Sequence, residues 1–299
     1  MNILLFIGCN HDQVPYLVEL KEYQFEIIGT DINPNAPGRA FCDEFYQVGY
    51  DDFDGLVEVG IKENFTSKDE VFTASAQFAH KGAACFANFF DIKYINERTI
   101  DLCLDKTLFY KRFQKLDIPI PETSFISDKD KLINAISNSD KNSNYFLKSD
   151  FSKNPHYIYR FNINNLNIDE IFWGRDRYLQ NHYILQKEFV GESLRINLYG
   201  ERFNVFQFDP MKKLKNKKDE IIKSGVIKSL VNFIKDQHLE KWLIKFDIIL
   251  NNEGYVVLDV GLDPPFRMVN ESKLLNINFA KYYVKHYLHQ QVEYPESLD

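Results

Sequence analysis

The first 31 residues contain a strand–helix–strand pattern, which restricts the fold more than any other feature of the sequence. Residues 2–8 form a continuous apolar run that ends in glycine, as expected for a strand buried on both faces of a parallel sheet. Residues 12–22 place apolar side chains at helical spacing, and residues 25–30 form a second apolar strand ending at Asp31. This order predicts a βαβ unit. Because short strand and helix patterns continue, we expect a small α/β layer domain over residues 1–98.

The second half of the chain has a different pattern, with alternating strands and one long amphipathic helix. Residues 182–209 contain three alternating segments, which predict an antiparallel meander. Residues 219–236 have the spacing of one helix. Apolar strands at 243–250 and 255–260 are separated by Asn-Asn-Glu-Gly, a composition typical of a hairpin turn. The two strands are therefore expected to lie side by side.

These patterns divide the chain into three predicted parts. The α/β domain at 1–98 is followed by two parts that mix helices with antiparallel strands, at 99–181 and 182–299. The predicted fold class is thus α/β and α+β.

Composition restricts the partners. The net charge is −7, from 36 Lys+Arg and 43 Asp+Glu, and the pI is about 5.6, so the chain lacks the broad cationic field that attracts nucleic acid or anionic membranes. No apolar run approaches the about 18 residues of a membrane span. The four cysteines form no CxxC pair, which favours reduced thiols and a cytoplasmic location. We expect small-molecule partners, no nucleic acid and no membrane; a homodimer is a common state for soluble enzymes.

Two aspartates in the predicted hairpin indicate a cation site. Asp247 and Asp259 lie within apolar strands that the short turn should place together. Burying two carboxylates close to each other is unfavourable unless a cation compensates, and hard oxygen ligands suit Mg²⁺. Lys106, which opens a helix, and Lys148, which ends an apolar strand, could neutralise phosphate oxygens. Together they predict a phosphoryl-transfer site with no P-loop, because G-x-x-x-x-G-K-[ST] does not occur.

An alternative is nicotinamide dinucleotide binding by the N-terminal βαβ unit. Asp31 ends the second strand, where such a domain holds the ribose. The turn after the first strand reads Gly8-Cys-Asn-His-Asp-Gln13, however, and the later glycines of G-x-G-x-x-G are absent. An oxidoreductase is therefore the weaker hypothesis.

Several motifs together resemble the ATP-grasp ligases, and within them carboxylate–amine ligases with a layout like carbamoyl phosphate synthase. Residues 28–46 resemble part of the family's pre-ATP-grasp domain. Asp105-Lys106 followed by Ile118-Pro-Ile-Pro121 is similar to the entry into its ATP-binding region, and Leu147-Lys148 to its second phosphate-binding lysine. The resemblance implies a Rossmann-like pre-ATP-grasp domain followed by an ATP-grasp domain of two α+β subdomains.

The resemblance also implies roles for individual residues, with ATP and Mg²⁺ (or Mn²⁺) as cofactors. Lys106 and Lys148 would bind phosphates. The segment Gln186-Lys-Glu-Phe-Val-Gly-Glu192 is similar to the hinge that holds adenine, so Gln186 and Phe189 would contact the base and Lys187 would belong to the same nucleotide-binding segment. Glu192 would hold the ribose, although a one-residue shift gives that role to Ser193. The metal ligands would be Asp247, Asp259 and Asp263.

The implied activity is that of an ATP-dependent carboxylate–amine ligase (EC 6.3-like). A small-molecule carboxylate would be activated as an acyl phosphate and joined to an amine, with Arg195, Lys245 and Arg267 as catalytic cations. Two features depart from the family pattern. The second metal strand usually carries Glu-x-Asn, where this chain has Asp259-Val-Gly261, and the loop after Lys148 contains no glycine. They favour the alternative of a catalytically degenerate homologue that binds nucleotide or a metabolite without turnover.

Overall fold

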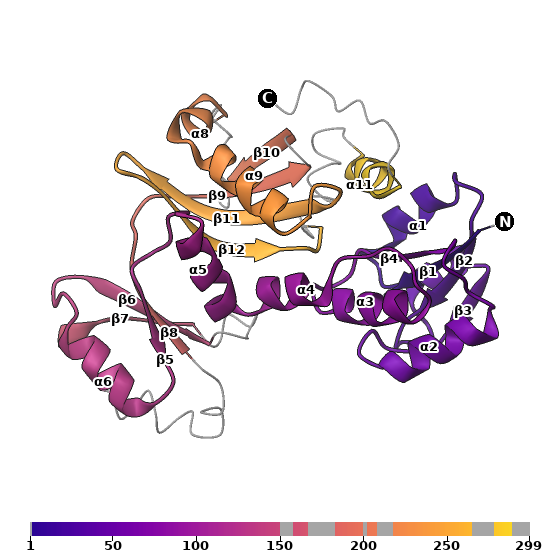
Figure 1. Ribbon diagram of the computed structural model, residues 1–299, viewed down its shortest axis with the longest axis horizontal. Helices are drawn as coiled ribbons and strands as arrows, with labels where there is room; N and C mark the ends of the chain where they lie inside the picture. The colour runs from indigo at the N-terminus through magenta and orange to yellow at the C-terminus, as the bar shows by residue number, and fades with distance from the viewer. Residues whose placement is uncertain are drawn as a thin grey trace.

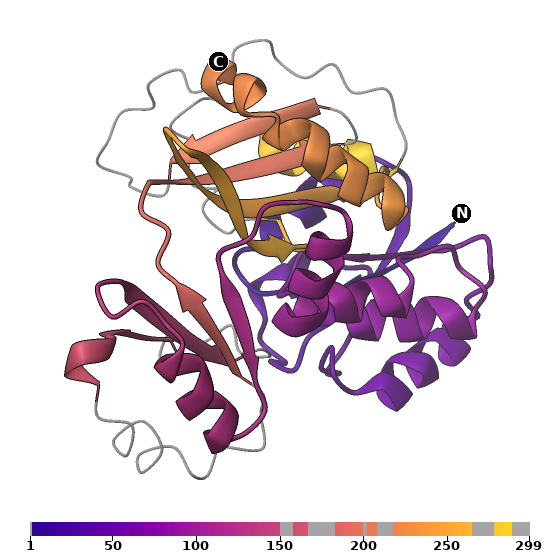
Figure 2. The ribbon, with the colours of Figure 1, turned by 60° about the vertical axis from the view of Figure 1, so that its left-hand side comes forward.

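A computed structural model describes residues 2–149, 158–166, 183–199, 202–207, 218–264 and 278–288. Three four-stranded sheets form its framework, one parallel and two antiparallel (Figures 1 and 2). The predicted mixture of α/β and α+β architecture is confirmed. No helix among these residues has the length and apolar character needed to cross a bilayer.

The N-terminal sheet is fully parallel, with the strand order β3-β2-β1-β4. Its strands are β1 (Ile3–Ile7), β2 (Glu26–Thr30), β3 (Glu44–Tyr46) and β4 (Glu70–Thr73). Alternate side chains of β1 enter different cores, because Leu4 and Phe6 pack on one face while Leu5 and Ile7 pack on the other. This burial on both faces explains the continuous apolar run and confirms the expected Rossmann-like layer structure.

Helices cover both faces of this sheet. One face packs against α1 (Val14–Leu20) and the C-terminal α11 (Phe279–Tyr287), which lie side by side in Figure 1. The other packs against α2 (Phe53–Lys62) and α3 (Ala79–Phe89). A short 3-10 helix, η1, spans Pro37–Phe41. The C-terminal helix therefore completes the core of the N-terminal domain, a contact between distant parts of the sequence.

Two consecutive helices lead from this domain to the rest of the molecule. They are α4 (Glu97–Leu104) and α5 (Lys106–Lys115). Asp105 separates them and caps α5, because its carboxylate accepts a hydrogen bond from the Leu108 N–H at 3.0 Å. The cap fixes Lys106 as the first residue of α5, as the sequence predicts.

The middle sheet has the order β5-β8-β6-β7, and all its pairings are antiparallel. Its elements are β5 (Thr123–Ile126), β6 (Asn144–Ser149), β7 (Ile158–Asn162) and β8 (Tyr183–Lys187), with α6 (Lys129–Ser137) and the 3-10 helix η3 (Ile163–Asn165). The predicted three-strand meander is wrong in its first strand, because β8 pairs with β5 and β6. Alternation identified a strand, but its partners lie far away in the sequence.

The C-terminal sheet has the order β10-β9-β11-β12 and is antiparallel. Its strands are β9 (Glu192–Tyr199), β10 (Arg202–Gln207), β11 (Leu243–Asn251) and β12 (Gly254–Gly261). The predicted hairpin of β11 and β12 is confirmed. The single predicted helix at 219–236 is instead two helices, α8 (Lys218–Ser224) and α9 (Val226–Asp236), because Gly225 takes a φ of +77° that an α-helix does not allow.

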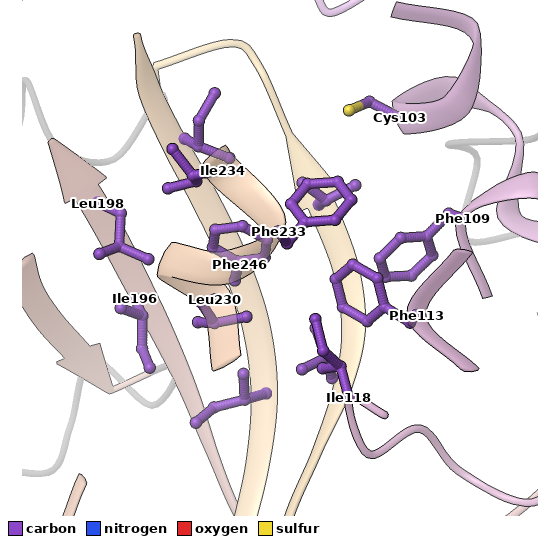
Figure 3. Packing of buried hydrophobic residues seen from close by; sticks show 14 of the residues in the cluster. Cys103, Phe109, Phe113, Ile118, Ile196, Leu198, Leu230, Phe233, Ile234 and Phe246 are labelled. Atoms are coloured by element: carbon purple, nitrogen blue, oxygen red, sulfur yellow. The ribbon is translucent and has the colours of Figure 1, made fainter. Parts of the chain in front are cut away.

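The largest hydrophobic core lies on one face of this sheet and joins α5 and α9 to it. Phe113 of α5, Phe233 of α9 and Phe246 of β11 meet there, with the Phe113 and Phe233 ring centroids 4.8 Å apart (Figure 3). The opposite face of β11 carries Lys245 and Asp247. The core thus holds α5 against the sheet that carries the predicted metal ligands. The domain ranges 1–98, 99–181 and 182–299 stay predictions.

Candidate active site

A pocket of about 360 Å³ lies between the middle and C-terminal sheets. Its volume is within the range of small-molecule sites. Seven of the residues predicted from the sequence line it, together with six others. The predicted residues are Lys106, Lys148, Arg195, Lys245, Asp247, Asp259 and Asp263; the others are Gln77, Ile158, Ser193, Leu258, Val260 and Gly261. Residues far apart in the sequence therefore meet at one place.

The two central aspartates lie directly opposite each other on neighbouring strands. Asp247 of β11 is paired with Asp259 of β12 in the antiparallel ladder, and both line the pocket. The register shifts immediately after Asp247, between this residue and Ile248. Because directly opposed residues of an antiparallel pair point to the same face, both carboxylates reach the same side of the sheet, which the predicted cation site requires.

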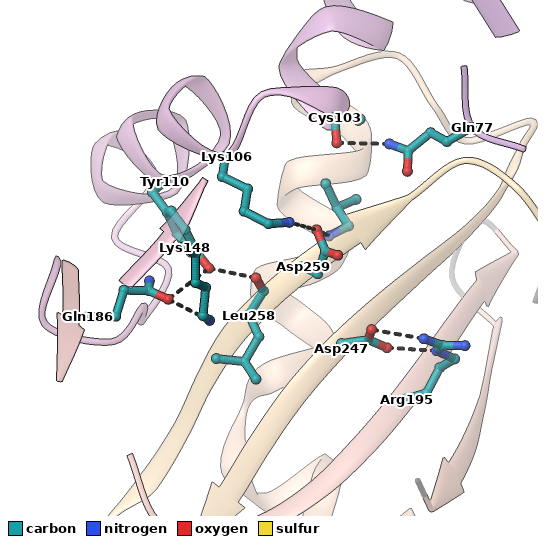
Figure 4. Close-up of polar contacts among 11 residues, drawn as sticks. Gln77, Cys103, Lys106, Tyr110, Lys148, Gln186, Arg195, Asp247, Leu258 and Asp259 are labelled. Atoms are coloured by element: carbon teal, nitrogen blue, oxygen red, sulfur yellow. Dashed lines mark hydrogen bonds and ion pairs between the residues drawn. The ribbon is translucent and has the colours of Figure 1, made fainter. Parts of the chain in front are cut away.

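Arg195 binds Asp247 through two parallel hydrogen bonds. Its Nε and one terminal nitrogen donate to the two carboxylate oxygens at 2.7 and 2.8 Å (Figure 4). Although burial by itself lowers the pKa of the Arg195 guanidinium, the hydrogen bonds and charge of Asp247, with the charges of Asp263 and Asp259, raise it above its ordinary value. Arg195 is therefore a fixed cation at the pocket wall, held in a bidentate geometry.

Lys106 makes the equivalent contact with Asp259. Its ammonium lies 3.0 Å from Oδ1 of Asp259, which also accepts the N–H of Val260 at 3.1 Å. Figure 4 shows the Lys106 side chain extending from α5 toward β12. No group of the described residues donates a hydrogen bond to Oδ2 of Asp259, whose side chain is 44% exposed. One carboxylate oxygen is thus open to the pocket.

Lys148 is held by a neutral group. Its ammonium donates to Oε1 of Gln186 at 2.8 Å, and Gln186 in turn donates to the Thr123 hydroxyl at 2.9 Å. Burial, and then the charge of Lys106, lower the pKa of Lys148 to about 8, against an opposing effect of Asp259. Among the described residues Lys148 forms no ion pair. Its ammonium is therefore held by a neutral oxygen, whereas Lys106, Arg195 and Lys245 each contact a carboxylate.

Lys245 lies on the same strand as Asp247 and forms an ion pair with the third predicted acid. Its ammonium is 2.7 Å from Oδ2 of Asp263, and each side chain is 17% exposed. Among the described residues, four cations and three carboxylates therefore line the pocket, with a net positive charge of one. Such a wall suits an anionic ligand.

The predicted nucleotide-binding residues of the hinge segment do not all lie at the pocket wall. The Gln186 side chain is 1% exposed and lies behind Lys148, so in this structure it positions that lysine. The Lys187 ammonium lies 3.4 Å from Asp140, away from the pocket wall. Phe189 and Glu192 are half-buried at the connection between the two sheets and are not among the lining residues. Their roles stay predictions.

Ser193 lines the pocket where Glu192 does not. Successive residues of β9 point to opposite faces, so Ser193 shares its face with Arg195. This placement favours the one-residue shift that the sequence leaves open. Arg267 and the glycine-free loop from residue 150 to 157 lie outside the described residues.

Gln77 is a lining residue that the sequence analysis does not identify. It precedes α3, is 2% exposed, and donates to the Cys103 carbonyl at 2.8 Å. Its contact brings the N-terminal domain to the edge of the pocket. No spacing or motif separates Gln77 from an ordinary structural glutamine.

Within the described ranges, no group of three or more His, Cys, Asp or Glu side chains is arranged to hold a metal ion. A cation here must therefore take ligands from the Asp247–Asp259 pair together with oxygens of a ligand or water.

The N-terminal Asp31 has a structural role, because its carboxylate accepts the N–H groups of Cys9 and Asn33 at 2.7 and 2.9 Å. These contacts occupy the acid on which the dinucleotide hypothesis depends.

Comparisons with known proteins agree with the architecture. N5-carboxyaminoimidazole synthetase from Staphylococcus aureus, complexed with ADP, has a TM-score of 0.75 and 11% identity over 98% of this chain and 79% of its own. For L-amino acid ligase from Bacillus licheniformis the TM-score is 0.68, with 13% identity over 96% and 74%. The biotin carboxylase domain of Hydrogenobacter thermophilus 2-oxoglutarate carboxylase, in complex with MgADP, ADP and bicarbonate, has a TM-score of 0.73 and 11% identity over 99% and 72%.

The chain has the ATP-grasp fold. The structural matches cover almost all of it, so the predicted resemblance extends from the N-terminal domain to the C-terminal sheet. No protein-family profile matches the sequence, and no curated protein matches it significantly. At 11–13% identity the ATP-grasp likeness concerns the fold, and the residues of the pocket carry the argument about chemistry.

Proposed function

We propose that this chain is an ATP- and Mg²⁺-dependent ligase that activates a small-molecule carboxylate and joins it to an amine. The observation that carries the proposal is the convergence of Lys106, Lys148, Asp247 and Asp259 in one pocket between two antiparallel sheets. Two lysines suit a phosphate chain, and two facing carboxylates suit a hard cation bound to that chain. ADP and MgADP complexes among proteins of the same fold support nucleotide as the ligand.

The donor set fits one divalent cation. Asp247 and Asp259 face each other in register, and Oδ2 of Asp259 is open to the pocket. Mg²⁺ is commonly bound by one or two carboxylates, with phosphate oxygens and water completing its shell. When bound, it would neutralise and orient the phosphates. When the cation binds Asp259, the Lys106 ammonium would leave this carboxylate and contact the same phosphates.

The proposed reaction has two steps. A carboxylate oxygen of the acid substrate attacks the γ-phosphorus of ATP, which forms an acyl phosphate and releases ADP. The amine nitrogen then attacks the acyl carbon, the bond to the phosphate oxygen breaks, and an amide, inorganic phosphate and a proton result. Neither step needs a nucleophile from the protein, so positioning and charge stabilisation supply the catalysis.

Arg195 and Lys245 are the candidate catalytic cations within the described residues. Both line the pocket beside Asp247, and the paired acids fix the position of each charge before a ligand enters. Fixed cations near a developing negative charge stabilise it without reorganisation. Arg267, the third predicted cation, stays a prediction. The ligase names of related folds, including L-amino acid ligase, support the C–N bond-forming class.

A screen of amino acids and other small carboxylates for ADP release with Mg²⁺-ATP tests the proposal. We expect Mg²⁺-ATP to raise the melting temperature, and continuous ADP release over many turnovers to require both an acid and an amine. Lys148→Ala and Asp259→Asn should abolish release, whereas Lys115→Ala, at an exposed position of α5, should not change it. Absence of any nucleotide effect on melting in the unmodified protein would refute the proposal.

The second candidate is a degenerate homologue that binds nucleotide without turnover. Gly261, which contributes no side-chain ligand beside Asp259, is the observation that favours it. A nucleotide-dependent melting shift that is lost in Lys148→Ala, without ADP release for any acid and amine pair, would support this alternative.

A further inference from the structure

Lys245 occupies the space in front of Gly261. The two residues are directly paired across β11 and β12, and the lysine stem lies over the glycine. A Cβ atom on residue 261 would lie 2.1 Å from Cε of Lys245, 2.9 Å from its Cγ and 3.0 Å from its Cδ. Three stem carbons would have to move together to admit any side chain. The glycine and the lysine are therefore structurally dependent on each other.

Asp263 fixes the ammonium at the end of that stem. The Nζ–Oδ2 distance is 2.7 Å, and both side chains are largely buried at the pocket wall. A cation in this position has less freedom than a solvated lysine, because its stem and its charged end are both held. The pocket thus contains an ammonium fixed in position close to the Asp247–Asp259 pair.

The carboxylate oxygens available to metal ions are few. Arg195 occupies both oxygens of Asp247, and Lys106 with the Val260 N–H occupies Oδ1 of Asp259. Of the Asp247–Asp259 pair, Oδ2 of Asp259 is the oxygen that no described residue contacts. Asp263 binds the Lys245 ammonium through Oδ2, and residue 261 offers no side chain. These acids can anchor one ion, but a second would face the ammonium of Lys245.

We propose that the site takes a single divalent cation with its nucleotide, and that the Lys245 ammonium, held in place by its stem and by Asp263, faces the phosphates where a second cation would otherwise lie. This inference rests on the proposed function. According to this inference, Gly261 leaves room for the Lys245 stem, and its lack of a side chain is not the loss of a metal ligand. The site would then be complete with one metal ion.

Counting bound Mn²⁺ by electron paramagnetic resonance tests this directly, without turnover. The full chain is saturated with Mn²⁺ and a non-hydrolysable ATP analogue, and bound metal is compared with bound nucleotide. We expect one Mn²⁺ per nucleotide. In the double variant Lys245→Ala, Gly261→Asn we expect two, because the stem and its ammonium are gone, an amide oxygen is added, and the ion pair of Asp263 with residue 245 is lost. Lys115→Ala, an exposed lysine with the same substitution, should bind one.

The outcomes separate the inference from the proposed function. Two Mn²⁺ per nucleotide in the unmodified chain would overturn the inference, as would nucleotide bound with no Mn²⁺, or a double variant that still binds one. No nucleotide bound to the unmodified chain would overturn the proposed function itself. If the double variant does not fold, Lys245→Met alone keeps the test: we expect one Mn²⁺ and about tenfold weaker nucleotide affinity. Unchanged affinity there would also overturn the inference.

Discussion

The protonation of Lys148 should control nucleotide affinity near neutral pH. Its pKa is lowered to about 8, first by burial and then by the charge of Lys106. A lysine binds phosphate in its charged form, so a rise in pH through the folded pKa removes the charge and weakens binding. A phosphate beside the ammonium stabilises the charged form, so the bound state titrates at higher pH. The pKa of Lys148 in the nucleotide-free protein therefore determines the pH at which nucleotide affinity begins to fall.

The expected size follows from the position of that pKa. For one group with a pKa near 8 that must be protonated to bind, apparent affinity falls about 25-fold between about pH 7.5 and about pH 9.5. Isothermal titration calorimetry with a non-hydrolysable MgATP analogue measures this change. Lys148→Arg is the matched control, because arginine remains charged over the whole range and reports every other pH effect.

Comparing the two titrations tests whether Lys148 is the group whose ionisation changes the affinity. We expect the affinity of Lys148→Arg to change by less than about threefold over the same range. If the unmodified protein and Lys148→Arg lose affinity in parallel, the titrating group is not Lys148. If neither loses affinity, the lysine is not in contact with the phosphates.

Three further variants test the structure around the pocket. Arg195→Met leaves the half-buried Asp247 charge without its partner, and should lower the free energy of unfolding by about 2 kcal/mol in urea denaturation; a change below about 0.5 kcal/mol would contradict the pair. Asp105→Ala removes the cap of α5 and should lower the unfolding free energy by about 1 kcal/mol, whereas Asp105→Asn should retain most of it. Gly225→Ala should lower it by about 1 kcal/mol through its positive φ alone, since no atom lies within 4 Å of the added Cβ; thermal unfolding unchanged would contradict this.

The sequence predicts the Asp247–Asp259 arrangement because the information is local. A four-residue turn with a glycine joins two apolar segments, so their pairing and approximate register follow from the hairpin. Lys106 is likewise predicted from local sequence, as a lysine that opens a helix, and the structure adds that Asp105 caps this helix. The pairing of β1 with β2 is predictable for the same reason, because one short helix joins them, whereas β4 pairs with β1, which is distant in sequence.

The features that the sequence does not predict involve contacts between residues that are distant in sequence. Alternation identifies β8 as a strand, but nothing in that segment specifies β5 and β6 rather than β9 as its neighbours. The ion pairs Lys106–Asp259 and Lys245–Asp263 are equally invisible, since they depend on how α5 and the end of β12 pack against the sheet. Gly261 is the clearest example: the sequence indicates a lost ligand, whereas the structure places a lysine stem there.

The pocket cations differ in whether a phosphate must displace a carboxylate in order to bind them. A phosphate oxygen that approaches Lys106 competes with a carboxylate 3.0 Å away, and one that approaches Arg195 competes with two hydrogen bonds to Asp247. At Lys148 it replaces only the amide oxygen of Gln186, 2.8 Å away. A charged acceptor forms a stronger hydrogen bond with an ammonium than a neutral amide does. Nucleotide affinity should therefore follow the charge of Lys148 more closely than that of any paired cation, which is why a single ionisation is expected in the pH titration.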